Sequence, residues 1–571
     1  MQPIIHFENF TFQYDSQQRP TLRNIDLTIY AGEKVCIVGP SGSGKSTLAH
    51  CINGLIPERY EGKFTGKLEL NGEPATSFSL FDRSKQVGTV LQDTDSQFIG
   101  LTVAEDIAFA LENDMVPKQQ MKELVQKAAE QVEIADHLNN QIFELSGGQK
   151  QRTAMAGVLV NNVDILLFDE PLANLDPATG KSAMALIERL HNDMQKTIIL
   201  VEHRLEDVLS QPIDRIILMN NGQIVADLPP ADLLQTDLLE KNDIREPLYI
   251  RLLKYAGVDV STIQHLDQLE QLNIEAYADK IHSWFELAAH KENIPPQREE
   301  VLRLNEVSFT YAKANSPTLH NINLQVQAGE FISIVGTNGA GKSTLAKCIC
   351  GFEKVKQGNI DINGANAKKD SLKSRAEKVG FVLQNPNQMF SQPKIYDEVA
   401  FGLRQRNVSE PEIQTRVFEI LKVCGLYPFR NWPIAALSYG QKRRVAIAAI
   451  LVLNPSIIIL DEPTAGQDYK HAKELMDFLH SLTAHGTTIL VITHDMHLMT
   501  EYTNRTIVVH DGQIIADKKP SQVLTDLSLV KQAYLKESSL YTVATKLGFT
   551  TPFELVECFI QYERGVLAHG K

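Results

Sequence analysis

Two segments of the chain have the residue types and the spacing that could hold the phosphate groups of a nucleotide. They read GPSGSGKST (39–47) and GTNGAGKST (336–344), and both fit the pattern G-x-x-x-x-G-K-[ST]. The glycines let the backbone turn so that its N–H groups face the phosphates, directly after a strand-like run and ahead of a helical pattern. In this chemistry Lys45 and Lys342 reach the β- and γ-phosphates, while Ser46 and Ser343 offer a hydroxyl to Mg²⁺.

Each half of the chain also ends an apolar run in an Asp-Glu pair. The pairs are Asp169-Glu170 and Asp461-Glu462, and both stand in the tripeptide DEP. A carboxylate pair at the carboxyl end of a buried strand lies where an α/β sheet binds its ligand. We expect the aspartates to hold Mg²⁺ and the glutamates to orient or deprotonate the attacking water.

A histidine follows a further apolar run in each half. The runs are TIILVEH, which ends at His203, and TILVITH, which ends at His494. A lone histidine in such a place is usually structural. Its duplication after a strand in a nucleotide-binding pattern favours contact with the γ-phosphate.

These matches arise because the chain consists of two halves with similar sequences. Lys45 and Lys342 lie 297 positions apart, and Gln92 and Gln384 lie 292 apart. The signature-like segments LSGGQ (145–149) and LSYGQ (437–441) are also 292 apart. Two homologous halves with equal loop lengths are the economical explanation.

The elements that must position these residues have the pattern of an α/β fold. Short β-branched runs alternate with longer amphipathic segments, and KVCIVG (34–39) and ILLFDE (165–170) are apolar enough to be central strands of a largely parallel sheet. The segments after each core also repeat, since REPLYIRLLKYAG (245–257) aligns with KESSLYTVATKLG (536–548). We place ATPase domains at 1–230 and 298–522, and helical appendages at 231–297 and 523–571. The Pro-rich, charged stretch 292–300 is the expected junction.

Composition narrows the class of protein. With 571 residues, a net charge of −14 and a pI near 5.6, the chain is too long for one core and too acidic for a sequence-independent grip on nucleic acid. No apolar run approaches the length of a membrane-spanning helix, and the N-terminus lacks the features of a signal peptide. We expect a cytosolic protein, or one that touches a membrane from that side. We also expect the cysteines to be reduced, small apolar residues rather than a metal or redox site (Cys36, Cys51, Cys348, Cys350, Cys424 and Cys558).

With these motifs the chain resembles the ATP-binding-cassette (ABC) ATPases over both cores. The resemblance implies an α/β fold class with two ABC-type P-loop ATPase domains in tandem, each with a small C-terminal helical appendage. It implies ATP and Mg²⁺ as cofactors, adenine stacking by Tyr14 and Tyr311, and Q-loop glutamines at Gln92 and Gln384. It also implies that the signature of each core completes the nucleotide site of the other.

The residues that the resemblance assigns to ATP are spread over four motifs in each half. Those of the first half are Tyr14, Gly39, Ser41, Gly42, Gly44, Lys45, Ser46, Thr47, Gln92, Ser146, Gly147 and Gly148. Those of the second half are Tyr311, Gly336, Asn338, Gly339, Gly341, Lys342, Ser343, Thr344, Gln384, Ser438, Tyr439 and Gly440. The expected Mg²⁺ ligands are Ser46, Gln92, Asp169, Ser343, Gln384 and Asp461, and the expected catalytic residues are Glu170, Glu462, His203 and His494.

The signature segments differ at one position, because Tyr439 stands where the first half has Gly147. A signature loop opens a helix, with its serine as an N-cap and its backbone N–H groups directed at the γ-phosphate. In one interpretation the ring of Tyr439 points away and both sites hydrolyse ATP. In the other, the site of the first half is slower and serves mainly as a clamp.

The type of cassette ATPase is suggested by two further stretches. Tandem cassettes that act on RNA join their halves through a basic linker, but residues 231–300 carry 7 Lys and Arg against 14 Asp and Glu. The stretch after the first Q-loop, QDTDSQFIGLTVAEDIAFALEN (92–113), looks like that of energy-coupling-factor (ECF) importers, which take up vitamins and metal ions. The alternatives are the ATPase of a sugar importer and a soluble ATPase acting on ribosomes or nucleic acid.

The ECF resemblance implies partners as well as a location. These are integral membrane subunits for coupling and substrate binding, with no direct contact to nucleic acid, and the ATPase lies peripherally on the cytoplasmic side of the cell membrane. Because QNPNQMFSQPKIYDEVAFGL (384–403) differs from its first-half counterpart, the two halves are expected to meet non-identical surfaces. The appendages could stabilise the pairing of the halves or only cap each core.

Overall fold

The computed structural model describes the backbone of all residues except 1, 174, 289–297, 313–315, 485 and 570–571. The chain divides into two compact units. One comprises Met1–Lys280 and the short segment Asp468–Lys470, and the other Ile281–Gln467 and His471–Lys571. The expected junction at 292–300 therefore lies mostly outside the described residues.

The first unit is built on a six-stranded sheet with the strand order β10-β9-β3-β8-β7-β6. Five strands pair in parallel and β10 runs antiparallel at one edge. The strands are β3 (Lys34–Val38), β6 (Val87–Val90), β7 (Ile165–Asp169), β8 (Thr197–Val201), β9 (Arg215–Asn220) and β10 (Gln223–Leu228). Both runs that the sequence marks as central, now β3 and β7, lie in the interior of the sheet, and β3 is buried throughout. The prediction of a largely parallel sheet is confirmed.

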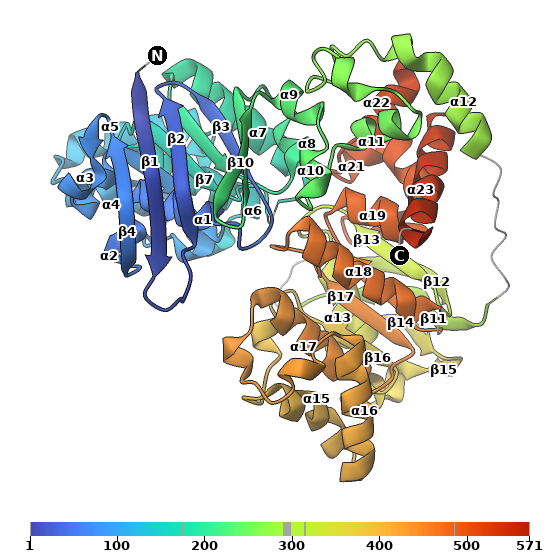
Figure 1. Ribbon diagram of the computed structural model, residues 1–571. Helices are drawn as coiled ribbons and strands as arrows, with labels where there is room; N and C mark the ends of the chain where they lie inside the picture. Colours follow the sequence, from blue (N-terminus) through green and yellow to red (C-terminus); the bar gives the residue numbers. More distant parts are fainter. Residues whose placement is uncertain (1, 174, 289–297, 313–315, 485, 570–571) are drawn as a thin grey trace. The chain divides into compact units, whose positions relative to one another are not determined.

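A second, antiparallel sheet of four strands was not predicted. Its order is β2-β1-β4-β5, with β1 (Pro3–Tyr14), β2 (Leu22–Tyr30), β4 (Gly62–Leu70) and β5 (Glu73–Pro74). Apolar side chains of β1, such as Phe7 and Phe12, share one core with Leu48 of helix α1 (Lys45–Asn53) and with Ile37 of β3. Helix α1, which follows the phosphate-binding segment, is therefore held between the two sheets (Figure 1).

The remaining helices of the first unit pack around the six-stranded sheet or form the appendage. Around the sheet they are α4 (Val103–Asn113), α5 (Lys118–Gln131), α6 (Gly147–Leu159), α7 (Pro177–Met194) and α8 (Leu205–Val208). The appendage contains α9 (Pro230–Leu234), α10 (Leu238–Lys241) and α11 (Leu248–Tyr255). Short turns follow α11. They are tied to this helix because the hydroxyl of Tyr249 in α11 donates to Leu266 O in the turns at 2.7 Å.

The second unit repeats both sheets. Its six-stranded sheet has the order β16-β17-β18-β13-β19-β20 and its four-stranded sheet the order β12-β11-β14-β15. The strands are β11 (Glu300–Phe309), β12 (Leu319–Gln327), β13 (Phe331–Val335), β14 (Gln357–Ile362), β15 (Ala365–Asn366), β16 (Val379–Val382), β17 (Ile457–Asp461), β18 (Thr488–Ile492), β19 (Arg505–His510) and β20 (Gln513–Lys518). The main helices of this core are α13 (Lys342–Cys350), α15 (Ile395–Arg404), α16 (Glu410–Val423), α17 (Tyr439–Leu451), α18 (Tyr469–Thr483) and α19 (Met496–Tyr502).

The C-terminal appendage is helical, as its sequence predicts. It contains α20 (Pro520–Thr525), α21 (Leu527–Gln532), α22 (Ser539–Lys546) and α23 (Pro552–His569). Residues 281–288 of helix α12 (Ala278–Ala288) belong to the second unit and contact this appendage: the rings of Trp284 and Tyr562 lie 5.4 Å apart, and those of Phe285 and Phe549 5.2 Å. The end of the first-half tail is thus docked on the second-half tail (Figure 1).

Two expectations about the surface and the thiols can be compared with the structure. In the described part of the chain, no helix combines the length and the apolarity needed to cross a bilayer. All six cysteines are buried and free of disulfide bonds. They behave as small apolar side chains, as predicted.

Candidate functional site: two phosphate-binding loops at strand ends

The first phosphate-binding loop joins β3 to α1. Gly39 leaves β3 so close to β9 that a Cβ would lie 2.2 Å from Met219 O, and Gly44 caps α1 with a φ of 103°. Only glycine fits the first place, and it is strongly favoured at the second. The loop therefore delivers Lys45 to the first turn of α1 because its glycines permit this path.

Lys45 is 6% exposed and folds back on its own loop. Its Nζ donates to Gly39 O at 2.8 Å and to Pro40 O at 3.0 Å. Burial lowers the pKa of Lys45 to about 8, against the opposing charges of Glu170 and Asp169. The ammonium group is held by neutral carbonyls that phosphate oxygens, being charged, can outcompete.

The second loop has the same geometry. Lys342 is also 6% exposed, and its Nζ donates to Gly336 O at 2.8 Å and to Thr337 O at 2.7 Å. Gly341 caps α13 with a φ of 100°. The other predicted loop residues lie in the same strand–loop–helix segments: Ser41, Gly42, Ser46 and Thr47 in the first, and Asn338, Gly339, Ser343 and Thr344 in the second.

Three neighbouring strands of the first unit bring predicted site residues together. Gln92 follows β6, Glu170 follows β7 with a φ of 49°, and His203 follows β8. His203 Nε2 lies 2.8 Å from Glu170 Oε1, and the Gln92 amide donates to Glu170 Oε2. The side chain of Glu170 is thus oriented from both sides.

The two carboxylates of the first pair have opposite pKa shifts. Burial raises the pKa of Asp169 to about 6, and the neighbouring Glu170 adds to this rise. Burial would also raise the pKa of Glu170, but the hydrogen bond and charge of His203, together with the charge of Lys45, outweigh it and the pKa is lowered. The lowered pKa favours the ionised form of Glu170, which is the form that a proton acceptor requires.

The second pair is arranged similarly but with looser contacts. His494 Nε2 lies 3.4 Å from Glu462 Oε1, and the backbone N–H of His494 donates to Glu462 Oε2 at 3.4 Å. Burial, reinforced by the charge of Asp461, raises the pKa of Glu462. Asp461 accepts a hydrogen bond of 2.8 Å from the hydroxyl of Ser343.

The predicted adenine-stacking tyrosines lie beside the loops. The hydroxyl of Tyr14 is 3.0 Å from Thr47 Oγ1, and that of Tyr311 is 3.3 Å from Thr344 Oγ1. Each ring therefore stands next to the first turn of the helix that follows the loop. Adenine stacking by these rings stays a prediction.

The signature segments open helices, as predicted. Ser146 caps α6 and Ser438 caps α17, each in a capping box with the glutamine three residues on. Gly147 and Gly148 begin α6, and Gly440 is the second residue of α17. The side chain of Tyr439 lies outside the described part of the structure, so both interpretations of that residue stay open, as does the role of each signature toward the other half.

One buried carboxylate of the first site was not predicted. Glu202 is 2% exposed and accepts hydrogen bonds from the backbone N–H groups of Leu172 at 2.8 Å and His203 at 2.9 Å. It fixes the loop after Glu170 against the loop that carries His203. The repeat gave no signal for it, because the second half has Thr493 at the equivalent position.

The expected Mg²⁺ ligands were tested for their fit to that ion. Ser343 and Asp461 are in hydrogen-bond contact, so a hydroxyl and a carboxylate oxygen converge at one point, which suits an ion that prefers oxygen. Among the described residues no group of three or more His, Cys, Asp and Glu side chains could hold a metal. The expected set does not need such a group, since it combines one carboxylate with a hydroxyl and an amide.

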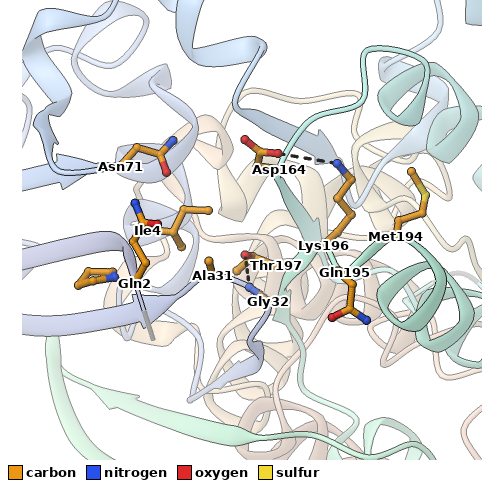
Figure 2. A pocket seen from close by; sticks show the side chains of 11 residues that line it. Gln2, Ile4, Ala31, Gly32, Asn71, Asp164, Met194, Gln195, Lys196 and Thr197 are labelled. Atoms are coloured by element: carbon orange, nitrogen blue, oxygen red, sulfur yellow. Dashed lines mark hydrogen bonds and ion pairs between the residues drawn. The ribbon is translucent and has the colours of Figure 1, made fainter.

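A polar pocket of about 270 Å³ lies elsewhere in the first unit (Figure 2). It is lined by the residue before β7, Asp164, and by the start of β8, Lys196 and Thr197. These are the amino ends of strands whose carboxyl ends carry Glu170 and His203. Thr197 Oγ1 accepts from Gly32 N, and Lys196 Nζ donates to Asn162 O. The pocket is thus not the predicted nucleotide site.

Comparisons with known proteins agree with this geometry. Residues 22–173 and 319–465 match the family described as ABC transporter, and residues 236–309 match the family described as ATP-binding cassette cobalt transporter. A protein of Enterococcus faecalis provisionally named as an ABC transporter ATP-binding protein is 55% identical, with 99% of each chain covered. A similarly named protein of Clostridium perfringens is 51% identical, with 98% of this chain and 99% of that one covered.

Among solved structures, that of cbiO1 from Clostridium perfringens, described as part of the ABC transporter complex cbiONQ, is 32% identical with a TM-score of 0.38. It covers 41% of this chain and 94% of that one. The family matches span both cores, and the relatives span nearly the whole chain. The chain therefore belongs to the ATP-binding proteins of ABC transporters, as an ATPase that carries the ATP-binding cassette twice.

Proposed function

We propose that this ATPase is the energy-coupling subunit of an ECF-type importer and powers uptake of a vitamin, a vitamin precursor or a metal ion. Its partners would be separate membrane subunits for coupling and substrate binding, which place it peripherally on the cytoplasmic side of the cell membrane. The family match at 236–309, whose description names a cobalt transporter, supports a metal ion among these substrates.

The observation that carries the proposal is an apolar patch that we define by Ile99, Leu101 and Phe143. These side chains are 63%, 79% and 76% exposed. The backbone N–H of Ile142 donates to Leu101 O at 3.1 Å, so the segments carrying Leu101 and Phe143 lie side by side. Large exposed apolar side chains that gather in this way mark a docking surface.

The patch is held rigidly, close in sequence to Gln92. The carboxylate of Asp106 accepts hydrogen bonds from Ile99 N at 2.8 Å and Gly100 N at 3.1 Å. Because Asp106 lies in the first turn of α4, the loop is fixed to that helix. Movements of the segment that follows Gln92 would therefore be transmitted to a partner that docks on the patch.

The second half holds its loop by the same device but exposes different side chains. Glu398 Oε2 accepts from Ser391 N at 2.8 Å and Gln392 N at 2.7 Å. At the 292-residue offset, the patch residues become Ser391, Pro393 and Ala435. This difference supports partners with two non-identical docking surfaces.

The chemistry of each site follows from its own residues. We propose that Lys45 and Lys342 bind the β- and γ-phosphates, that Glu170 and Glu462 accept a proton from the attacking water, and that His203 and His494 contact the γ-phosphate. The Mg²⁺ ligands would be Ser46, Gln92 and Asp169, with Ser343, Gln384 and Asp461 in the second site. Once bound, Mg²⁺ would neutralise charge on the phosphates.

Two further proposals rest on the family resemblance. Each signature helix would complete the nucleotide site of the other half, with Ser146 serving the loop of Lys342 and Ser438 the loop of Lys45. ATP binding would then favour a closed arrangement and hydrolysis would release it, because a ligand shifts a population toward the state that binds it better.

The test is co-purification from detergent-solubilised membranes of the native host. Wild type is expected to retain hydrophobic multi-span subunits in stoichiometric amount, and Leu101→Asp is expected to lose them because it places a charge in the patch. Met115→Asp is the matched control, since Met115 is 89% exposed but lies outside the patch. ATPase activity of the isolated chain should be similar in all three.

Two results would contradict the proposal. Ribosomal material in place of membrane subunits would support the alternative of a soluble ATPase. Equal recovery of membrane subunits with Leu101→Asp and with wild type would show that the patch is not the docking surface. If the recovered complex transports a sugar, the importer type is wrong although the transporter assignment stands.

A further inference from the structure

Arg443 is a cation buried in the second cassette at a place where the first cassette has a neutral residue. It lies in α17, five residues after the capping Ser438, and is 1% exposed. Among the residues that the structure describes, it is the largest side chain that is fully buried. At the offset of 292 residues the equivalent position is Gln151 of α6.

The guanidinium of Arg443 joins two loops of the predicted site. Its Nη1 donates to Pro463 O and, at 3.3 Å, to Ala465 O, while its Nη2 donates to Gln384 O at 2.7 Å. Pro463 directly follows the predicted catalytic Glu462, and Gln384 is the predicted Q-loop residue. The helix of the signature, the Q-loop and the strand end that carries the carboxylate thus meet at one side chain.

The first cassette makes a smaller connection at this place. Gln151 is 4% exposed, and its side-chain Nε2 donates to Pro171 O at 2.8 Å. Pro171 is the equivalent of Pro463. Both side chains thus donate to the carbonyl of the proline after the carboxylate. Arg443 donates in addition to the Q-loop carbonyl, Gln384 O.

The physical difference between the two side chains is large. An arginine presents five N–H donors in a planar fork, and a glutamine presents two on one nitrogen. Burying a cation costs several kcal/mol unless hydrogen bonds compensate it, so a neutral glutamine would be the cheaper residue for packing alone. In Arg443 the hydrogen bonds to three backbone carbonyls offset the free-energy cost of burial, and they also fix the positions of the loops that carry these carbonyls.

We propose that Arg443 is a positioning residue of the second cassette, which fixes the Q-loop at Gln384 relative to Glu462 from the signature helix. In the second cassette these three parts move as one body. In the first cassette Gln151 leaves the Q-loop at Gln92 freer to follow its own partner. The asymmetry lies within the hydrogen bonding of each unit and is independent of which molecule is transported.

The test is a double-mutant cycle on the steady-state ATPase of the full chain carrying Glu170→Gln throughout, so that the measured turnover comes from the second site. Arg443→Gln is expected to lower kcat about tenfold with little change in KM, because misplacing a group that orients the reaction slows the chemical step more than binding. In a Gln384→Ala background the same substitution is expected to change kcat less than about twofold, since the residue it positions is gone. In a Gln92→Ala background, the matched control, the tenfold factor should persist.

Two outcomes would overturn the proposal. Equal factors in the Gln384→Ala and Gln92→Ala backgrounds would show that Arg443 acts only on the fold. Full turnover in Arg443→Lys would show that charge suffices without the fork. The glutamine variant is expected to fold because Gln151 already fills the equivalent place, and the urea midpoint of unfolding checks this; if it does not fold, the lysine variant decides.

Discussion

Glu170 and Glu462 occupy the same place after equivalent strands, but their surroundings differ at short range. Glu170 has His203 Nε2 at 2.8 Å and the Gln92 amide as a donor, whereas His494 Nε2 lies 3.4 Å from Glu462. The pKa of Glu170 is lowered by its partners, and burial raises that of Glu462. Both halves keep a carboxyl group at the place of a proton acceptor, and the ionised form is favoured more strongly in Glu170 than in Glu462.

Replacing each glutamate by glutamine tests whether both sites hydrolyse ATP. We expect Glu170→Gln and Glu462→Gln to reduce steady-state ATPase activity by similar factors, because each removes the proton acceptor of one site, a contribution of about 10²–10⁴ to that site. A large loss with Glu462→Gln and a small one with Glu170→Gln would instead indicate that the first site is a clamp. Binding of a fluorescent ATP analogue, expected to be retained by both variants, is the control.

At this scale the sequence predicted where the site residues lie, but it did not predict which buried groups hold them in place. Lys45, Glu170 and His203 could be placed because a motif ties each to the end of a strand. Glu202 and Arg443 could not, since a buried charge is explained only by the carbonyls and N–H groups that surround it. Those partners come from segments far apart in the sequence, such as Gln384 and Pro463 around Arg443.

At the scale of elements, helix α19 links the predicted site of the second half to the C-terminal appendage. It begins after Asp495, which follows His494 and caps the helix through His497 N and Leu498 N. At its other end, Arg564 of α23 donates to Thr500 O and Glu501 O, both at 2.9 Å. The appendage therefore satisfies carbonyls that the end of a short helix would leave unpaired.

Removing this cap should weaken the second unit. Arg564→Ala is expected to lower the free energy of unfolding by about 3 kcal/mol, because it leaves buried carbonyls without a donor. It should also reduce ATPase activity through the position of His494. Urea unfolding and steady-state turnover measure the two effects, and Arg564→Lys should recover part of both; unchanged stability in Arg564→Ala would contradict the contacts described.

A carboxylate within the appendage gives a pH dependence of known sign. Burial would raise the pKa of Glu557, but hydrogen bonds from Ser521, Gln561 and Lys519 outweigh it and the pKa is lowered. Since the folded-state pKa lies below that of the unfolded chain, the ionised carboxylate stabilises the fold above pH 4.5 and this contribution is lost as the pH falls through the lowered pKa.

Glu557→Gln should therefore destabilise the protein at pH 7 and have little effect in acid. We expect a loss of about 1 kcal/mol at pH 7, typical of a lost hydrogen bond to a charged group. Urea midpoints of the variant and of wild type, measured from pH 7 to well below pH 4.5, should converge as the pH passes the lowered pKa of Glu557. A constant difference across this range would show that the charge of Glu557 is not responsible.

The sequence predicted secondary-structure elements well where one pattern of apolar residues ran through the whole segment. The six-stranded sheets followed from continuous apolar runs such as β3 and β7. The four-stranded sheets were missed because β1 pairs with β2 and β4 at irregular register, and bulges interrupt its alternation. Pairing between such strands depends on partners that no local pattern identifies.

At the scale of the whole molecule, a helix that the sequence places at the end of the first tail is docked on the second. The ring of Trp284 in α12 contacts that of Tyr562, and Phe285 and His282 both contact Phe549. The two interpretations of the tails, that they stabilise the pairing of the halves or only cap each core, stay predictions. The docking of α12 depends on long-range aromatic contacts, which explains why helical spacing alone did not reveal it.

Cleavage of the chain between these parts is a direct experiment. With a protease site introduced within 289–297, the two fragments are expected to co-elute after cutting, because residues 281–288 stay bound to α23. Trp284→Ala, which removes a buried side chain worth about 3–5 kcal/mol in a core, should weaken the association of the fragments, so that less of the pair co-elutes on size-exclusion chromatography without nucleotide. Separation of the cut wild-type protein would show that α12 does not hold its place.

Attachment of the first tail to α23 makes two properties of this polypeptide separable. Synthesis as one chain guarantees that both cassettes are made in equal number, whereas the aromatic side chains of α12 supply a contact that does not depend on the covalent link. A gene divided after the codon for Ala288 should thus still yield an assembled pair of fragments. The cell would lose the equal synthesis of the two cassettes, but not the contact between α12 and the second tail.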